Sequence, residues 1–174
     1  DDGPQSGDSM TLAVCWITEL GRAIVRLMEE QQSMEIKIQK LHKDAVLPKY
    51  ETKGSAGMDL SILEDVILKP GETTLCRTGL SLSIPTNYEG QIRSRSGLAL
   101  NGVVVANSPG TIDSDYRGEV RVLLRNVTNE FVALGAGTRV AQLIIAPVMP
   151  VTWEETDGLS ETDRGSGGFG STGA

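Results

Sequence analysis

The spacing of hydrophobic residues changes near residue 35. Before this point, between residues 11 and 32, apolar positions recur every three or four residues, with charged residues between them. The recurring positions are Ile17, Leu20, Ile24 and Leu27. They would share one face of a helix, so we expect an amphipathic helix here. The polar, acidic residues 1–9 are expected to be disordered, and residues 1–33 form an N-terminal extension to which the sequence assigns no role.

From residue 35 onward the hydrophobic period is two, which is typical of β-strands. The alternating apolar positions are Ile36 and Ile38; Leu60, Ile62, Val66 and Leu68, interrupted by Glu64; Leu80, Leu82 and Ile84; and Val120, Val122 and Leu124. Continuous apolar runs at Val103–Val105 and Leu143–Ile145 indicate strands buried on both faces. Turn residues such as Lys69-Pro70-Gly71 separate these stretches. Many short strands predict an all-β sandwich or barrel, which we assign to residues 34–153.

Composition narrows the classes of function. The chain has 174 residues and a formal net charge of −7, enough for one domain with a hydrophobic core and some appendages. A net acidic chain is a poor general binder of nucleic acid or membrane surfaces, so we expect neither partner, and any phosphate must bind at a local site. The sequence shows neither an apolar run of membrane-spanning length nor the basic start of a signal peptide.

The cysteines and the single histidine offer little chemistry. Cys15 and Cys76 lie far apart and match no metal or redox spacing, so we expect both to be structural. Two isolated thiols fit a reducing compartment, and cytosol is the default expectation, with a nuclear, organellar or viral setting left open. His42 has no obvious partners for a catalytic triad in its neighbourhood, and we expect a structural or surface role for it.

The segment Arg164–Gly173, RGSGGFGSTG, combines one cation, one aromatic ring, three hydroxyls and five glycines in ten residues. Glycine lets the backbone approach a ligand closely, and a guanidinium beside hydroxyls suits a polyphosphate. Phe169 offers a flat face that can stack on a base. The alternative is a flexible Gly/Ser tail or an expression remnant. The acidic, turn-rich residues 154–163 would connect this segment to the core.

Two upstream loops also suit a nucleotide. Arg95-Ser96-Gly97 joins a guanidinium, a hydroxyl and a glycine N–H, which together match the edge of a phosphate. The segment Asn107–Gly118 has turn residues at both ends, so we expect a β-hairpin whose amides fold around a small planar ligand, with Asp113 and Asp115 beside it. Taken alone, the first is a weak signal, because an arginine before a turn is usually just solvated. The alternative for the second is an ordinary turn that contains acidic residues.

Two strand-like segments carry isolated polar residues. Asp59 in AGMDL stands at the start of a strand, a pattern with little specificity of its own. Gln142 in GTRVAQL lies within an apolar strand, where a buried amide requires hydrogen-bond partners. It therefore serves a binding site, a subunit contact or a structural hydrogen bond.

Taken in order, five segments resemble the motifs of the trimeric deoxyuridine triphosphatases (dUTPases). They read AGMDL, RSRSGLA, NSPGTIDSDYRGEV, GTRVAQLI and RGSGGFGSTG, and the resemblance spans residues 35–173. It implies a jelly-roll-like β-barrel or sandwich, assembled as a homotrimer with active sites shared between subunits and closed by a C-terminal arm, residues 154–174. It also implies hydrolysis of dUTP to dUMP and pyrophosphate with Mg²⁺, which limits uracil in DNA and supplies dUMP for dTMP synthesis.

The resemblance implies a role for each motif. Asp113 matches the carboxylate that activates water for attack on the α-phosphorus, and Asp59 matches the acid that holds Mg²⁺ through water. The residues that match substrate-binding positions are Arg95, Ser96, Gly97, Asn107, Gly110, Thr111, Ile112, Tyr116, Gln142, Arg164, Ser166, Gly168, Phe169, Gly170, Ser171 and Thr172. Arg164 matches the γ-phosphate clamp, Phe169 would stack on uracil, and Tyr116 would lie where a 2′-hydroxyl collides.

Three positions depart from the family pattern. Met58 stands where the first motif usually has tyrosine, Ser94 where the second often has proline, and Thr138 where the fourth usually has aspartate. We expect the first to affect packing, the second to affect which arginine of the loop meets phosphate, and the third to remove a structural ion pair.

Three other functions fit parts of the pattern. The dCTP deaminases share the barrel, but the glycine-rich arm favours the hydrolase. A nucleotide-gated regulatory module would use the amphipathic face of residues 17–27 as its partner surface. A capsid-type structural jelly roll has no need of the arm.

Overall fold

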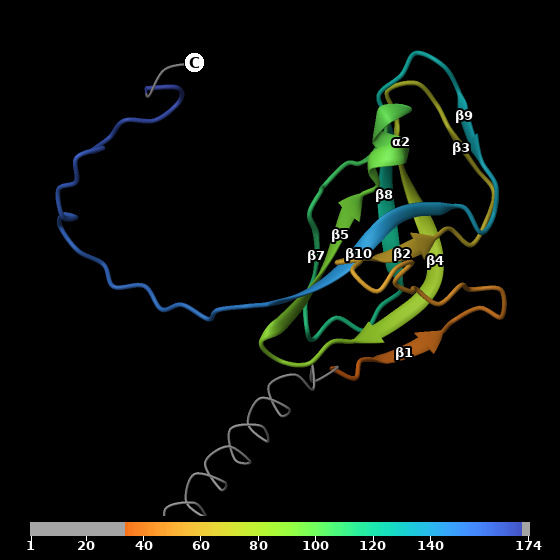
Figure 1. Ribbon diagram of the computed structural model, residues 1–174, viewed down its shortest axis with the longest axis horizontal. Helices are drawn as coiled ribbons and strands as arrows, with labels where there is room; N and C mark the ends of the chain where they lie inside the picture. The colour runs from red at the N-terminus through yellow and green to blue at the C-terminus, as the bar shows by residue number, and fades with distance from the viewer. Residues whose placement is uncertain (1–33, 172–174) are drawn as a thin grey trace, which may run out of the picture. The chain divides into compact units, whose positions relative to one another are not determined.

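The computed structural model describes residues 34–171, which form a β-structure with one short helix (Figure 1). The helix expected within residues 11–32, and Thr172 of the arm, lie outside the described residues. Within the described range no helix has the length and hydropathy needed to cross a membrane. The elements in chain order are β1 (Lys37–Lys40), β2 (Met58–Ser61), β3 (Val66–Leu68), β4 (Thr73–Ser83), β5 (Tyr88–Ser94), α2 (Ser96–Leu100), β6 (Val103–Val105), β7 (Gly110–Ile112), β8 (Val120–Asn126), β9 (Val132–Leu134) and β10 (Arg139–Pro147).

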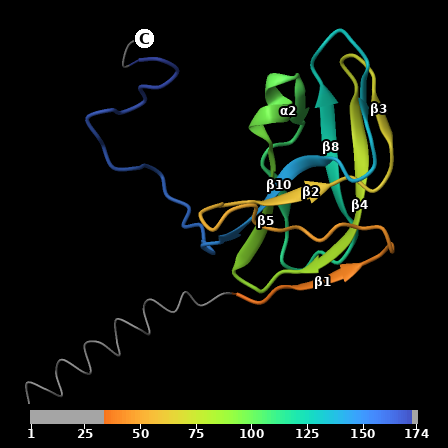
Figure 2. The same ribbon diagram turned by 45° about the vertical axis from the view of Figure 1, so that its right-hand side comes forward.

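The strands form two four-stranded sheets and a small ribbon. The first sheet has the order β1-β4-β8-β6, the second has the order β2-β10-β5-β7, and β3 pairs with β9. The long strands β5 and β10 are antiparallel over their full common length, from Ala141 opposite Ser94 to Pro147 opposite Tyr88. This pairing places the end of β5, and therefore the start of α2, beside the start of β10 (Figure 2).

The hydrophobic core lies between the inner faces of these sheets. In β8 the buried Val120, Val122 and Leu124 alternate with the exposed Arg121 and Arg125. One buried cluster joins these valines and leucines of the first sheet to residues of the second. Antiparallel sheets that bury one face each give this period-two pattern. The all-β sandwich or barrel expected from the sequence is therefore confirmed.

The sequence pattern misplaces the boundary between β2 and β3. The alternating apolar positions from Leu60 to Leu68 are all even-numbered, as in one continuous strand, yet the chain leaves the second sheet at Ile62 and Leu63. The Ile62 N–H donates to the Thr138 carbonyl beside the second sheet, and the Leu63 N–H donates to the Arg77 carbonyl of β4 in the first. Glu64, which interrupts the apolar pattern, follows this crossing.

The paired hairpin expected in residues 107–118 is not formed. Strand β7 pairs with β5 in the second sheet, with Thr111 opposite Gln91, and β8 pairs with β4 and β6 in the first sheet. Residues 113–119 therefore cross from one sheet to the other. A two-stranded turn and a sheet-to-sheet crossing share the same turn residues, which is why the sequence did not distinguish them.

Candidate active site

The second and fourth motifs meet in a pocket of about 370 Å³. Its lining consists of Arg95, Ser96, Gly97, Leu98, Asn101 and Gln142. Strand β5 ends at Ser94, whose hydroxyl accepts a hydrogen bond from the Val105 N–H at 2.8 Å, and Arg95 then leads into α2 in an extended conformation. The side chain of Gln142 reaches the pocket from β10 and is half-buried rather than enclosed in the core. The structure thus brings together the residues that the sequence proposed for phosphate.

A buried carboxylate holds the arginine of this pocket. Asp59 is 7% exposed, and its two oxygens accept from Arg95 Nε at 3.0 Å and Arg95 Nη2 at 3.3 Å. Arg139 Nη1 donates to Asp59 Oδ2 at 3.1 Å, and Arg95 Nη1 donates to the Arg139 carbonyl at 2.9 Å. Two-point pairing of this kind fixes the plane of a guanidinium. Asp59 therefore orients Arg95 at the pocket.

These contacts bear on where a metal could be held. Both oxygens of Asp59 already accept from arginines, and the carboxylate has little access to water. Within the described residues, no group of three or more His, Cys, Asp or Glu side chains is placed to hold a metal ion. The expected role of Asp59 as the holder of a hydrated Mg²⁺ stays a prediction, and the contacts that the structure shows for this carboxylate are to arginines.

The third motif presents its candidate residues around β7. Gly110 and Ile112 are buried and Thr111 is exposed. The Asn107 amide lies against Gly110, where an added Cβ would come within 3.0 Å of Asn107 Nδ2. Glycine at position 110 therefore leaves room for the amide, and a side chain there would displace it.

A turn follows β7 and exposes a carboxylate. The Tyr116 N–H donates to the Asp113 carbonyl at 3.1 Å, which closes the turn, and the Asp113 side chain is exposed. The Tyr116 hydroxyl donates to the Glu119 carbonyl at 3.0 Å. An ionised carboxylate in this setting accepts hydrogen bonds only, which suits orienting a water molecule.

The fifth motif has its own local structure. Arg164 Nε donates to the Gly167 carbonyl at 2.8 Å, and Gly165 and Gly170 adopt positive φ. Phe169 also has positive φ, 51°, and its ring is fully exposed. Ser166 and Ser171 are exposed, Gly168 is partly covered, and residues 147–166 ahead of and into this segment are exposed throughout. The pocket lining described above contains no residue of this segment or of the third motif.

Sequence reasoning assigned no role to two residues of the pocket lining, Leu98 and Asn101, or to Arg139, which pairs with Asp59 beside it. Leu98 and Asn101 come from α2, which is too short to produce a helical hydrophobic pattern, and Asn101 Nδ2 donates to the Gly97 carbonyl at 3.1 Å. Arg139 belongs to the fourth motif, but the sequence assigned it no role. Its position three residues before Gln142 on a strand was the available signal, but its partner Asp59 is 80 residues away in sequence.

Comparison with known proteins adds an independent finding. The dUTPase family model matches residues 43–173. The deoxyuridine 5′-triphosphate nucleotidohydrolase of Nautilia profundicola is 55% identical over 141 residues, covering 80% of this chain and 99% of that protein. The protein of the same name from Helicobacter pylori strain J99 is 50% identical over 141 residues, covering 80% of this chain and 97% of its own.

A solved structure agrees in fold. The structure of the Staphylococcus bacteriophage 80alpha dUTPase with dUPNHPP is similar to this chain with a TM-score of 0.76 and 27% sequence identity. The similarity covers 82% of this chain and 100% of the phage protein.

Proposed function

The chain belongs to the dUTPase family, whose fold is jelly-roll-like and whose members are dUTP diphosphatases, and we propose that it converts dUTP to dUMP and pyrophosphate by water attack on the α-phosphorus. The observation that carries this mechanism is the pocket in which Arg95, Ser96, Gly97 and Gln142 converge. In a cell the reaction would keep uracil out of DNA and supply dUMP for dTMP synthesis.

In this mechanism, most of the rate comes from positioning of the substrate and stabilisation of charge. Phosphoryl transfer requires little covalent chemistry from the protein, so oriented donors around the phosphates supply most of the rate. Arg95, whose plane is set by Asp59, and the donors Ser96, Gly97 and Gln142 would bind the phosphate oxygens. Asp113, exposed on its turn, would accept a hydrogen bond from the attacking water and aim it at the α-phosphorus.

We propose Mg²⁺ as the cofactor because triphosphates carry this cation, which keeps several waters and needs few protein ligands. When bound, Mg²⁺ would neutralise negative charge on the phosphates. The roles proposed for Arg95 and Asp113 do not require either residue to bind the metal.

Selectivity for uracil and deoxyribose would come from the third motif. Backbone groups around Asn107, Gly110 and Ile112 would imitate a base-pairing edge, which cytosine mismatches with costly unpaired polar groups. Thr111 lies on the exposed face of β7 beside this edge. Tyr116, 46% exposed, would face the sugar and leave no room for a 2′-hydroxyl.

We further propose a homotrimer whose active sites combine loops of different subunits and are closed by the arm, residues 154–174. Large apolar side chains remain exposed: Leu75 on the outer face of the first sheet, Ile67 on the ribbon, and Phe131 directly before β9. Where exposed apolar side chains form one contiguous patch, the patch is typical of a protein interface. In this arrangement Arg164, with Ser166, Ser171 and Thr172, would clamp the γ-phosphate. The flexible Gly168 and Gly170 would let Phe169 reach the base.

The test is pyrophosphate release from dUTP, dTTP, dCTP and UTP with Mg²⁺, using the wild type and Asp113→Asn. We expect turnover of dUTP alone and a loss of at least ~100-fold in the variant, as for removal of a general base. Equal turnover of dTTP would refute the proposed base recognition. Ammonia release from dCTP would identify a deaminase instead.

A further inference from the structure

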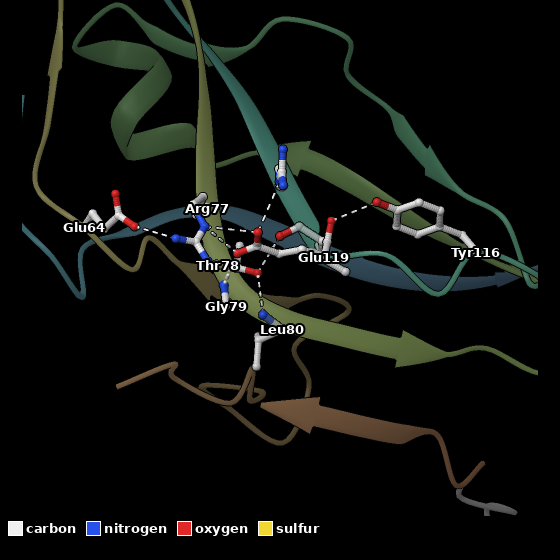
Figure 3. Close-up of polar contacts among 9 residues, drawn as sticks. Glu64, Arg77, Thr78, Gly79, Leu80, Tyr116 and Glu119 are labelled. Atoms are coloured by element: carbon white, nitrogen blue, oxygen red, sulfur yellow. Dashed lines mark hydrogen bonds and ion pairs between the residues drawn. The ribbon is translucent and has the colours of Figure 1, made fainter. Parts of the chain in front are cut away.

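Glu119, which directly precedes β8, is an almost buried carboxylate with a full set of partners from neighbouring strands (Figure 3). Its side chain is 8% exposed, and its oxygens accept from the Gly79 N–H at 2.9 Å, from Arg77 Nε at 3.1 Å and from Arg121 Nε at 3.2 Å. Burial raises the pKa of this carboxyl, but the hydrogen bonds from Gly79, Arg77 and Arg121 outweigh it and hold the pKa below its ordinary value. Glu119 is therefore a fixed anion between β4 and β8.

The partner strand is shaped to meet this carboxylate. The register of β4 against β8 shifts between Arg77 and Leu80, and Gly79 within this bulge has φ of +70°. The bulge turns the Gly79 N–H out of the ladder and toward Glu119, as bulges commonly redirect groups. An added Cβ at position 79 would approach Ala45 Cβ to 3.0 Å, so glycine is required by both conformation and space.

The same part of β4 holds the backbone on either side of Glu119. Thr78 Oγ1 donates to the Val120 carbonyl at 2.6 Å, and Ser81 Oγ donates to the Arg117 carbonyl at 2.8 Å. We call residues 77–81 together with Glu119 the β4 clamp. It fixes residues 117–120 at three points.

Tyr116 rests on this fixed backbone. Its hydroxyl donates to the Glu119 main-chain carbonyl at 3.0 Å, and its ring lies over Gly118, where an added Cβ would come within 2.5 Å of the ring carbon that bears the hydroxyl. Figure 3 shows the Tyr116 hydroxyl pointing toward Glu119. The orientation of the ring thus depends on where the backbone of residues 118 and 119 is held.

We propose that Glu119 is a positioning residue that acts through Tyr116 and sets the discrimination of dUTP against UTP. The β4 clamp holds the carbonyl to which the Tyr116 hydroxyl donates, so the Tyr116 ring keeps one orientation beside the sugar and sterically excludes a 2′-hydroxyl. If the ring could tilt, the 2′-hydroxyl of UTP would fit. This inference rests on the proposed function and extends it to a residue that does not touch the substrate.

A purely structural role for Glu119 would change stability without changing which sugar is accepted. The informative quantity is therefore the ratio of kcat/KM for dUTP to kcat/KM for UTP. We expect Glu119→Gln to lower this ratio about tenfold, because it removes the charge that Arg77 and Arg121 hold. Glu64→Gln is the matched control: it removes the other carboxylate partner of Arg77, at 2.9 Å and 58% exposed, and should leave the ratio within about twofold.

A double-mutant cycle tests whether Glu119 acts through Tyr116. Tyr116→Phe removes the hydrogen bond to the Glu119 carbonyl and should also lower the ratio. Combining it with Glu119→Gln should lower the ratio no further than the larger single effect. If Glu119→Gln fails to fold, Arg77→Lys replaces it, since lysine keeps the charge but loses the guanidinium geometry, and a smaller decrease in the ratio is expected.

The outcomes separate the two levels of the proposal. Multiplicative losses in the double variant, or an unchanged ratio in Glu119→Gln or its replacement, would overturn the inference while dUTP turnover stands. A wild-type chain that does not hydrolyse dUTP would overturn the proposed function, and the inference with it.

Discussion

Asp59 forms ion pairs with two arginines near the pocket, Arg95 and Arg139. The family resemblance assigned the acid to a metal and Arg95 to a phosphate, and the structure pairs the two side chains with each other. The sequence could propose Asp59, Arg95 and Gln142 as site residues because each stands in a recognisable motif. It could not propose the ion pair, because 36 residues separate Asp59 from Arg95 and only the folded sheets bring them together.

Asp59→Asn should lower the free energy of unfolding by about 2–3 kcal/mol, because loss of one buried partner leaves guanidinium groups without their counter-ion. The figure lies below that of a fully enclosed pair, since Arg95 is 27% and Arg139 is 47% exposed. Glu51→Gln is the matched control, because Glu51 contacts the same Arg139 at 3.3 Å but is 39% exposed, and it should cost at most about 1 kcal/mol. Urea denaturation at one protein concentration measures both. Equal losses would show that Asp59 is no anchor.

Cys76 should be unreactive in the folded protein. It is buried in β4, its Sγ lies 3.7 Å from the Thr74 carbonyl, and burial raises the pKa of the thiol from 9.0 to about 11. In a Cys15→Ser background, where Cys76 is the remaining thiol, an aromatic disulfide reagent at about pH 8 should label the folded chain at least ~100-fold more slowly than the urea-unfolded chain. The rise in pKa from 9.0 to about 11 lowers the thiolate fraction about 100-fold on folding, and burial slows access of the reagent further. Comparable labelling rates would contradict the buried position.

At the scale of elements, period-two patterns located the strands well where one strand stays in one sheet. The alternating segment Val120–Leu124 became β8 in this way, and the continuous apolar run Val103–Val105 became β6. The pattern failed where the chain changes sheets, at residues 62–65, because a crossing keeps the parity of buried positions without extending a strand. It also missed α2, whose five residues are fewer than two helical turns.

The bulge in β4 makes a prediction about two glycines with the same backbone angle. Gly79 and Gly71 both have φ of +70°, but an added Cβ meets Ala45 at 3.0 Å in the first and nothing within 4 Å in the second. Gly71→Ala should cost about 1–2 kcal/mol, the price of a left-handed conformation for an L-residue. Gly79→Ala should cost about 1–3 kcal/mol more, because the added methyl also overpacks the site. Urea denaturation of both variants checks the difference, and similar losses would rule out the steric contribution.

At the scale of the whole molecule, the sequence predicted the all-β architecture and the order of the motifs. It could not predict which loops of one chain meet. The second and fourth motifs line one pocket, whose lining includes no residue of the third or fifth. In the proposed homotrimer, loops of another subunit would supply the parts of the site that this pocket lacks.

Removing the arm separates assembly from catalysis. A chain that ends at Asp163 loses Arg164 and Phe169 but keeps every strand, and residues 147–166 are exposed and so contribute little to the core. We expect the truncated protein to remain a trimer and to lose at least ~100-fold in kcat/KM for dUTP, since it lacks both the phosphate clamp and the stacking ring. Light scattering after gel filtration and pyrophosphate release measure the two properties.

Point variants locate the loss within the arm. Phe169→Ala removes stacking worth about 1–3 kcal/mol, so it should reduce kcat/KM by roughly 5- to 150-fold in the full-length chain. Leu159→Ala is the matched control, because Leu159 is 90% exposed in the connector and its truncation should leave kcat/KM unchanged. A monomeric truncated chain would mean that the arm holds the subunits together. Full activity in the truncated chain would instead mean that the pocket and the Asp113 turn suffice for catalysis without the arm. The glycine-rich segment would then be a flexible tail with no role in the reaction.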